Sequence, residues 1–259
     1  MRFALTAEQR QFAATLHELL TDTPGEKAWP ALAELGVTAL AVPTERGGLG
    51  ADPTDLVVAF EELGHHAVPG PLVETLAAVP ALLAALDDTR WLPDLASGDL
   101  VASLAFPPHL PYAADADAAG LVLAVEESTV RIASVHGPAL STVDPSRRLF
   151  AIEAGAVLAI GSEALAAAER AFDLGVLACA AELLGAGRAM LELAVGYVKQ
   201  RTQFGRPIGS FQAVKHHLAD VHVALELARP LLYGAALSLT PYDVSAAKIA
   251  ATQAAQRAA

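Results

Sequence analysis

Two long helical patterns meet in the sequence Tyr197-Val198-Lys199-Gln200-Arg201-Thr202-Gln203-Phe204-Gly205-Arg206-Pro207-Ile208-Gly209-Ser210-Phe211-Gln212. Arg201 ends the first pattern, and the Gly- and Pro-rich segment 202–209 predicts a loop before the second helix begins at Ser210. A guanidinium, two side-chain amides and a helix start are thereby gathered in one place. This combination suits an anionic group such as a pyrophosphate. Taken alone, the pattern also fits a helix end or a surface ion pair.

Composition excludes several classes of protein. The 259 residues include 17 Lys and Arg against 29 Asp and Glu, a formal charge of −12, which argues against binding to nucleic acid or an acidic membrane surface. Hydrophobic residues make up 54% of the chain, yet no uninterrupted apolar stretch reaches the roughly 18 residues of a membrane span. We therefore expect a large protein–protein interface. A single cysteine, Cys179, and an N-terminus without an apolar signal core predict a cytoplasmic protein.

The pattern along the chain predicts a mainly α fold with a small β module. Helical spacing fills residues 1–99, although 37–42 is apolar enough to predict a short strand or an extended link. Short apolar runs bounded by Gly, Pro and Asp predict four or five strands within 100–160. Helical spacing returns over 161–259, with a last helix starting near Asp243 and no stop signal at the end, so this part is predicted to be truncated.

Other polar motifs receive structural interpretations. The adjacent pairs His65-His66 and His216-His217 diverge on a helix, so no metal site is expected at either pair. Glu61-Glu62 is likewise interpreted as a solvated helix face or helix end rather than an acid–base pair.

The spacing Y-x-x-x-R-x-x-F-G-x-x-I-x-x-F-Q-x-x-x-H-x-L-A-D over 197–220 resembles the acyl-CoA dehydrogenase family. Three N-terminal segments are similar to that family too, namely its opening helix at 5–10, its P-E-x-x-G-G-x-G loop at 43–50 and its E-E-L-G helix end at 61–64. The resemblance implies an α-helical N-terminal domain at 1–99, a reduced β middle domain at 100–160 and a C-terminal helical bundle at 161–259.

The resemblance also implies an activity and a set of site residues. Members of the family bind FAD and introduce a double bond between the α and β carbons of an acyl-CoA thioester. Their conserved arginine segment reaches a neighbouring subunit's FAD. Carried over to this sequence, the FAD-contacting residues are Arg201, Gln203, Phe204, Phe211 and Gln212, and Asp173 falls where the family binds the CoA portion of its substrate.

The sequence departs from the family pattern at three places. The flavin-binding segments T-E-P-x-x-G-S-D and W-I-T or W-I-S have no counterpart between the expected strand at 102–106 and Ala116-Asp117. Where some members carry the catalytic carboxylate this chain has Gly175, and the sequence ends before the later G-G-x-G loop that precedes the base in others. The resemblance therefore implies no catalytic base and no complete flavin site on this chain.

With these departures, the chain resembles the degenerate subunit of bacterial acyl-CoA dehydrogenase heterotetramers that act in steroid catabolism. The resemblance implies that FAD is held mainly by a second acyl-CoA dehydrogenase subunit and that the two subunits together act on an acyl-CoA substrate. Three alternatives stay open: a homo-oligomer, a non-catalytic scaffold of the same fold, and a complete acyl-CoA dehydrogenase of which this sequence lacks loops and a tail.

Overall fold

The computed structural model describes residues 5–259 and groups the chain into two compact units. Within the described residues, one unit contains 5–22, Val57–Ala67 and Val176–Ala259, and the other contains Thr23–Leu56 and Val68–Gly175. Two helices, α3 (Pro53–His65) and α6 (Ser162–Gln200), each contribute to both units. The predicted class, mainly α with a small sheet, is confirmed, while the predicted three-domain boundaries stay a prediction.

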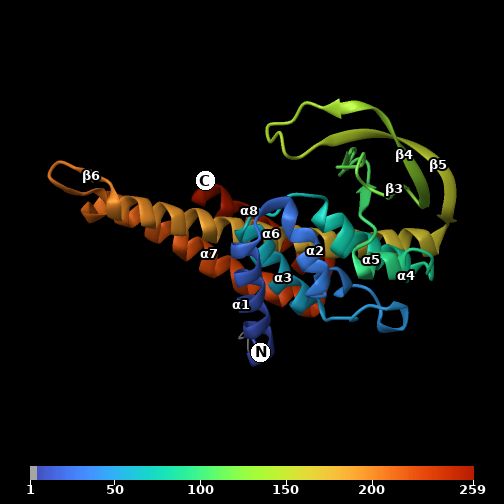
Figure 1. Ribbon diagram of the computed structural model, residues 1–259, viewed down its shortest axis with the longest axis horizontal. Helices are drawn as coiled ribbons and strands as arrows, with labels where there is room; N and C mark the ends of the chain where they lie inside the picture. The colour runs from blue at the N-terminus through green and yellow to red at the C-terminus, as the bar shows by residue number, and fades with distance from the viewer. Residues whose placement is uncertain (1–4) are drawn as a thin grey trace. The chain divides into compact units, whose positions relative to one another are not determined.

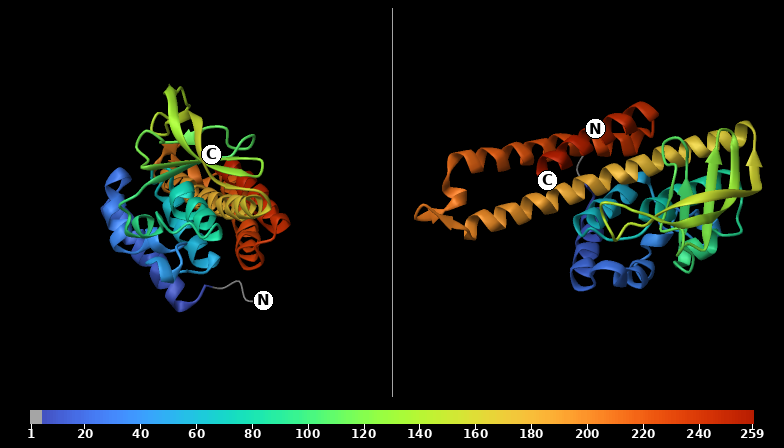
Figure 2. Two further views of the ribbon diagram at one scale, coloured as in Figure 1. Left: turned by 90° about the vertical axis from the view of Figure 1, so that its right-hand side faces the viewer. Right: turned by 90° about the horizontal axis from the view of Figure 1, so that it is seen from above.

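The first unit is a helical bundle. It contains α1 (Ala7–Asp22), the later part of α3, the later part of α6, α7 (Gln212–Ser238) and α8 (Pro241–Ala258). Figures 1 and 2 show α6 and α7 running antiparallel to a common tip, with α8 folding back along α7. Pro230 lies within α7 without dividing it, although proline cannot donate the backbone hydrogen bond of a helix interior.

Side-chain caps fix two helix starts in this unit. The Thr6 hydroxyl accepts from the Gln9 N–H at 3.1 Å, and the Gln9 side chain accepts from the Thr6 N–H at 3.0 Å, forming a capping box. The last helix begins earlier than predicted. Thr240, and not Asp243, is its N-cap, because the Thr240 hydroxyl accepts from the Asp243 N–H.

The second unit combines short helices with the sheet. Its helices are α2 (Ala28–Glu34), a π-helical turn at Glu74–Ala78, α4 (Val79–Ala85) and α5 (Leu92–Ser97). The strand or extended link predicted for 37–42 is wrong. Gly36, at φ 85°, ends α2, and the chain then closes a 3₁₀ turn through Val37–Ala39. Burial of this apolar run satisfies its hydrophobic pattern without a strand.

A five-stranded sheet forms the β module. Its strands are β1 (Ala102–Ala105), β2 (Ala113–Ala114), β3 (Leu121–Glu126), β4 (Thr129–Leu140) and β5 (Leu149–Ile160), in the order β1-β3-β4-β5-β2. β1 runs parallel to β3, and the other pairs are antiparallel. The core beneath the sheet joins apolar residues of β1, β3, α4, α5 and the first turns of α6. β4 and β5 reach 12 residues each because they pair as a long hairpin.

The sequence has no uninterrupted apolar stretch long enough for a membrane span, but the helix α6 passes a test of length and composition. α6 is long and apolar enough, by length and composition, to cross a membrane. Of the residues in its apolar window, 44% are buried inside the structure, and a single helix of this kind is weak evidence for a membrane span. This helix carries much of the apolar excess seen in the composition.

Candidate functional site

The segment between α6 and α7 forms a hairpin instead of an irregular loop. β6 (Thr202–Gln203) pairs with β7 (Arg206–Pro207), and the two residues between them have positive φ, 52° at Phe204 and 78° at Gly205. Two-residue hairpins favour such turns, because their twist matches that of the paired strands. The Ile208 N–H donates to the Arg201 carbonyl at 2.8 Å and closes the base of the hairpin.

This hairpin brings the five predicted FAD-contacting residues to one end of the bundle. Arg201, Gln203, Phe204 and Gln212 are exposed and Phe211 is half-buried. Phe204 is 91% exposed, and its ring meets that of Phe211 edge to face at 6.1 Å. The exposed face of the Phe204 ring is free to contact another molecule.

Arg206 belongs to the same cluster, although sequence reasoning gave it no role. Its guanidinium lies 4.2 Å from the centroid of the Phe211 ring, a cation–π contact. The start of α7 adds backbone donors. Phe211 stands at its N-cap position without a side-chain cap, so the first N–H groups of a 27-residue helix have no side-chain acceptor there. Guanidinium, amide and backbone N–H groups are the kinds of donor that bind anionic groups.

Asp173 and the hairpin cluster belong to different units of the chain. Asp173 belongs to the part of α6 assigned to the second unit, and it is half-buried. Burial raises the pKa of its carboxyl, and the neighbouring charge of Glu169 raises it further. Two residues on, Gly175 is buried, and an added Cβ would meet Val73 and Ala78 at 3.5 Å.

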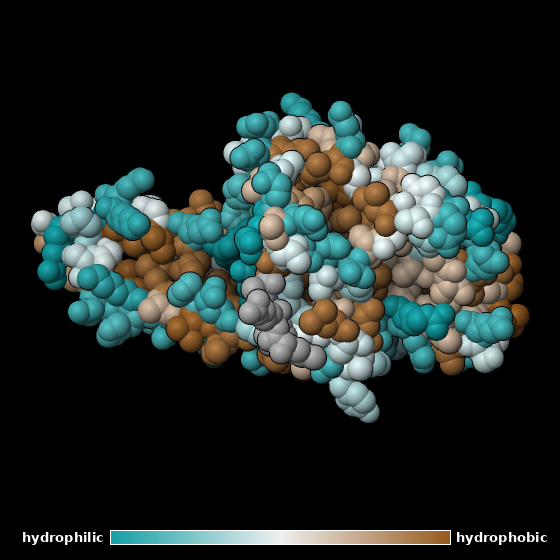
Figure 3. All heavy atoms as spheres, turned by 90° about the horizontal axis from the view of Figure 1, so that it is seen from below, coloured by the Kyte–Doolittle hydropathy of each residue, from teal (hydrophilic) through white to brown (hydrophobic). Residues whose placement is uncertain are grey.

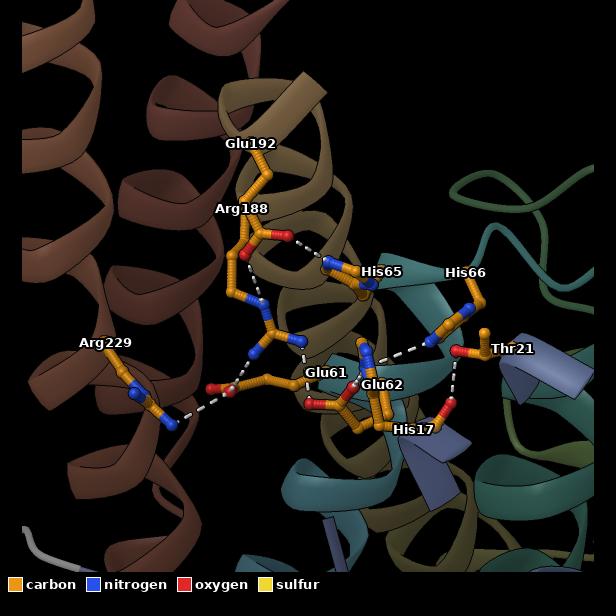
Figure 4. A network of polar contacts seen from close by, with 9 residues as sticks. All are labelled: His17, Thr21, Glu61, Glu62, His65, His66, Arg188, Glu192 and Arg229. Atoms are coloured by element: carbon orange, nitrogen blue, oxygen red, sulfur yellow. Dashed lines mark hydrogen bonds and ion pairs between the residues drawn. The ribbon is translucent and has the colours of Figure 1, made fainter. Parts of the chain in front are cut away.

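A second polar cluster, which we call the charged crossing, lies where α3 passes α6 in the bundle unit. It consists of Glu61, Glu62, Arg188 and Arg229 (Figure 4). Glycines permit the close approach. A Cβ at Gly64 would overlap the Glu182 carbonyl oxygen, and one at Gly185 would overlap that of Glu61. Gly64 therefore serves helix packing, and α3 continues past it to His65.

The interpretation of Glu61-Glu62 as a solvated helix face is wrong. Glu61 is 5% exposed and Glu62 is 6% exposed. Arg188 Nη2 donates to Glu62 Oε1 at 2.7 Å, and Arg229 Nη2 donates to Glu61 Oε2 at 3.2 Å. Buried carboxylates require such partners. No periodicity within α3 could reveal them, because both arginines come from helices more than a hundred residues later.

The two carboxyls respond to this setting in opposite ways. Burial raises the pKa of Glu61, and the charges of Arg229 and Arg188 only partly offset the effect. Burial acts in the same direction on Glu62, but the hydrogen bond and charge of Arg188 outweigh it and leave the pKa of Glu62 lowered. Glu62 is therefore the carboxylate of the pair with the stronger preference for the ionised form.

Three histidines gather beside the charged crossing, contrary to the expectation that His65 and His66 diverge. The rings of His65 and His66 have centroids 4.9 Å apart, and the ring of His17 from α1 lies 5.1 Å and 4.7 Å from them. α3 ends at His65, so His66 lies in the following turn. Both rings face His17 (Figure 4). Burial lowers the pKa of His66, and the neighbouring histidines lower it further.

Comparison with known proteins defines the class of this chain. The sequence profile of the acyl-CoA dehydrogenase C-terminal domain matches residues 165–259, and that of the N-terminal domain matches residues 4–99. Acyl-CoA dehydrogenase IpdE2 of Mycobacterium tuberculosis is 37% identical over 237 residues, covering 90% of this chain and 72% of its own. The chain therefore belongs to the acyl-CoA dehydrogenase family and is an oxidoreductase of that type.

Solved structures agree on the fold. The ChsE4-ChsE5 complex from Mycobacterium tuberculosis matches with a TM-score of 0.84 and 22% identity, over 100% of this chain and 86% of that one. A steroid acyl-CoA dehydrogenase variant, Tcur3481-Tcur3483, matches with a TM-score of 0.81 and 23% identity, over 97% and 84% of the two chains. At such identities the likeness concerns the fold alone.

Proposed function

We propose that this chain is one subunit of a flavin-dependent acyl-CoA dehydrogenase of the cytoplasm and that it contributes its hairpin to FAD held mainly by a partner subunit. The observation that carries the proposal is the exposed cluster at 201–212, in which a guanidinium, two amides and an aromatic ring extend from the end of the bundle. A hydrogen-bonded hairpin between two long helices presents these groups together at the end of the bundle. Such preorganisation favours binding to a ligand outside the chain.

The chemistry of the hairpin fits the diphosphate and the ring region of FAD. Arg201 and Gln203 supply charge-assisted and neutral hydrogen-bond donors, and Gln212 lies in the first turn of α7 where backbone N–H groups add to them. Phe204 offers an aromatic face. When bound, FAD supplies the hydride acceptor, and this chain's residues hold and orient it.

The proton-abstracting base is proposed to come from the partner. Gly175 occupies the position of the base in one branch of the family and has no side chain that takes a proton. Asp173 is proposed to contact the CoA portion of the substrate. Its raised pKa reflects burial and Glu169, and its half-buried setting fits a binding role. A steroid-derived acyl group is the proposed substrate class, because the departures from the family pattern resemble those of the degenerate subunits that act in steroid catabolism.

The bundle offers a surface for such a partner. Figure 3 shows apolar side chains along the arm formed by α6 and α7. Exposed apolar residues of the three long helices of the bundle unit include Leu193, Tyr197, Val223, Leu227, Leu231, Leu237, Tyr242 and Ile249. Exposed apolar side chains of this kind are what an obligate interface would bury. The ChsE4-ChsE5 complex, a structural neighbour, supports a hetero-oligomer by analogy.

The test is the visible flavin spectrum of purified protein. The chain is expressed alone and together with a second acyl-CoA dehydrogenase subunit that carries the flavin-binding segments. We expect no flavin band from the chain alone and a band from the complex. Arg201→Ala should reduce flavin retention in the complex by about 10-fold or more, as expected for loss of a charge-assisted hydrogen bond.

Arg90→Ala is the matched control. It also removes an arginine whose side chain is largely exposed, 59%, but it lies in the other unit, where Arg90 pairs with Asp88. Retention equal to that of the wild type in both variants contradicts the hairpin's role. A flavin band from the chain alone favours a self-sufficient enzyme, and no band from either sample favours a scaffold.

A further inference from the structure

We propose that His17, Glu62, His65 and His66 form a binding site for one divalent metal ion with a preference for imidazole ligands, Zn²⁺ first, that joins α1 to the end of α3. The four side chains each offer one ligand atom, and these atoms lie within 4.8 Å of one another. The site belongs entirely to the bundle unit and is independent of the flavin. We call these four residues the histidine cluster.

The spacing along α3 explains why three of the ligands share a location. Glu62 precedes His65 by three residues and His66 by four, and both separations bring side chains to the same face of a helix. α1 supplies the fourth ligand, His17, from 45 residues earlier. A site assembled from two helices in this way closes only when the bundle is folded.

Two distances within the histidine cluster lie near the spacing of ligand atoms in a tetrahedral site, and no two of its four ligand atoms are more than 4.8 Å apart. Zn²⁺ with bonds of about 2.1 Å has ligand atoms about 3.4 Å apart. His17 Nδ1 lies 2.9 Å from Glu62 Oε2 and 3.1 Å from His66 Nε2. One ring nitrogen thus faces two other ligand atoms at once. Without a metal, a single proton on His17 Nδ1 has to be shared between them, whereas a cation would engage all three lone pairs.

His65 provides an independent observation. Its Nε2 lies 2.9 Å from Glu192 Oε2, which fixes the proton on Nε2 and leaves the lone pair on Nδ1. That Nδ1 is buried and has no hydrogen-bond partner among the residues that the structure describes. A buried lone pair without a donor is costly. Metal-bound histidines commonly donate their other ring N–H to a carboxylate, which is the arrangement of His65 and Glu192.

Glu62 is likewise held by a hydrogen bond from a residue outside the four ligands. Its Oε1 accepts from Arg188 Nη2 at 2.7 Å, so the carboxylate is held ionised with Oε2 toward His17. The side chain of His17 is 46% exposed, which leaves a route for an ion to enter. Three neutral imidazoles and one carboxylate match the ligand preference of Zn²⁺ better than that of Mg²⁺ or Ca²⁺, which select oxygen.

The test uses the full chain without an affinity tag, freed of metal and titrated with Zn²⁺ by calorimetry. Co²⁺ serves as a visible probe, because a tetrahedral site gives it intense absorption. We expect one ion per chain. His66→Gln should weaken binding by more than about 100-fold, and Glu192→Gln, outside the ligand set, by about 10- to 100-fold.

Two controls keep the outcome decisive. His216→Gln removes an exposed histidine of α7 and should bind Zn²⁺ like the wild type. Glu192 is 60% exposed, so Glu192→Gln is expected to fold normally even if a variant in the ligand set does not. One equivalent of Zn²⁺ should also raise the thermal midpoint of the wild type more than that of His66→Gln. No saturable binding at one equivalent, or equal binding by wild type, His66→Gln and Glu192→Gln, would overturn the proposal.

Discussion

Two arginines of neighbouring sequence, Arg188 and Arg201, lie in different surroundings. Arg188 lies within α6 at the charged crossing, bonded to a carboxylate that is 6% exposed. Arg201 follows the last residue of α6 and is exposed on the hairpin. The first balances charges that the fold itself has buried. Among residues 5–259 no ion pair engages the second, so its guanidinium is available to another molecule. The same side chain therefore stabilises the fold at position 188, and at position 201 it is the one that the proposed flavin contact uses.

The largest test of this contrast replaces each arginine by methionine. Arg188→Met leaves the buried carboxylate of Glu62 without its cation, and we expect a loss of about 3–5 kcal/mol in the free energy of unfolding. Arg201→Met should stay within about 0.5 kcal/mol of the wild type, because exposed charges contribute little. Urea unfolding of both variants measures the difference. Equal free energies of unfolding for the two variants would show that Arg188 in the charged crossing contributes no more to stability than exposed Arg201.

A second test concerns the glycines that make the crossing possible. Gly185→Ala places a methyl group against the Glu61 carbonyl oxygen, so α3 and α6 have to separate. We expect a loss of about 1–3 kcal/mol. Gly196→Ala is the control on the same helix, since nothing lies within 4 Å of its added Cβ, and it should stabilise the chain by about 0.5–1 kcal/mol. Thermal unfolding distinguishes the two. A stabilised Gly185→Ala would mean that the close crossing is not required.

The hairpin side of the comparison was the more predictable one from sequence. Gly205, Pro207 and Gly209 indicate a turn by their own conformational preferences, so the break between two helices could be located from local chemistry alone. Glu61 and Glu62 could not be interpreted in this way. Their partners Arg188 and Arg229 come from distant helices, 126 and 168 residues away, and no local pattern encodes such a meeting.

The histidine cluster shows a second limit of local reasoning. Viewed along one helix, His65 and His66 diverge, and that interpretation could not include the arrival of His17 from α1. The Glu62–His65 and Glu62–His66 spacings were available in the sequence and could have raised the possibility of a shared face. The third histidine became relevant only when the bundle had brought α1 beside α3.

A third test examines the turn that holds the hairpin in shape. Gly205 has a φ of 78°, a conformation that side chains disfavour, so Gly205→Ala should cost about 1 kcal/mol. Gly205→Asn should cost less, since asparagine tolerates left-handed backbone. We expect the loss of flavin retention in the complex to follow the same order. Alanine and asparagine variants of equal stability would contradict the assigned turn geometry.

The smallest expected change in stability comes from Phe204, and it separates the two roles most clearly. A ring that is 91% exposed buries almost no apolar area, so Phe204→Ser should leave the free energy of unfolding within about 0.5 kcal/mol of the wild type. If the hairpin binds the partner's flavin, the same variant should still release FAD more readily on dilution of the complex. Leu177→Ser, at a position that is 0% exposed, is the opposite control and should unfold the bundle. A Phe204→Ser variant that is both stable and fully loaded with flavin would mean that the exposed ring contributes to neither fold nor cofactor binding.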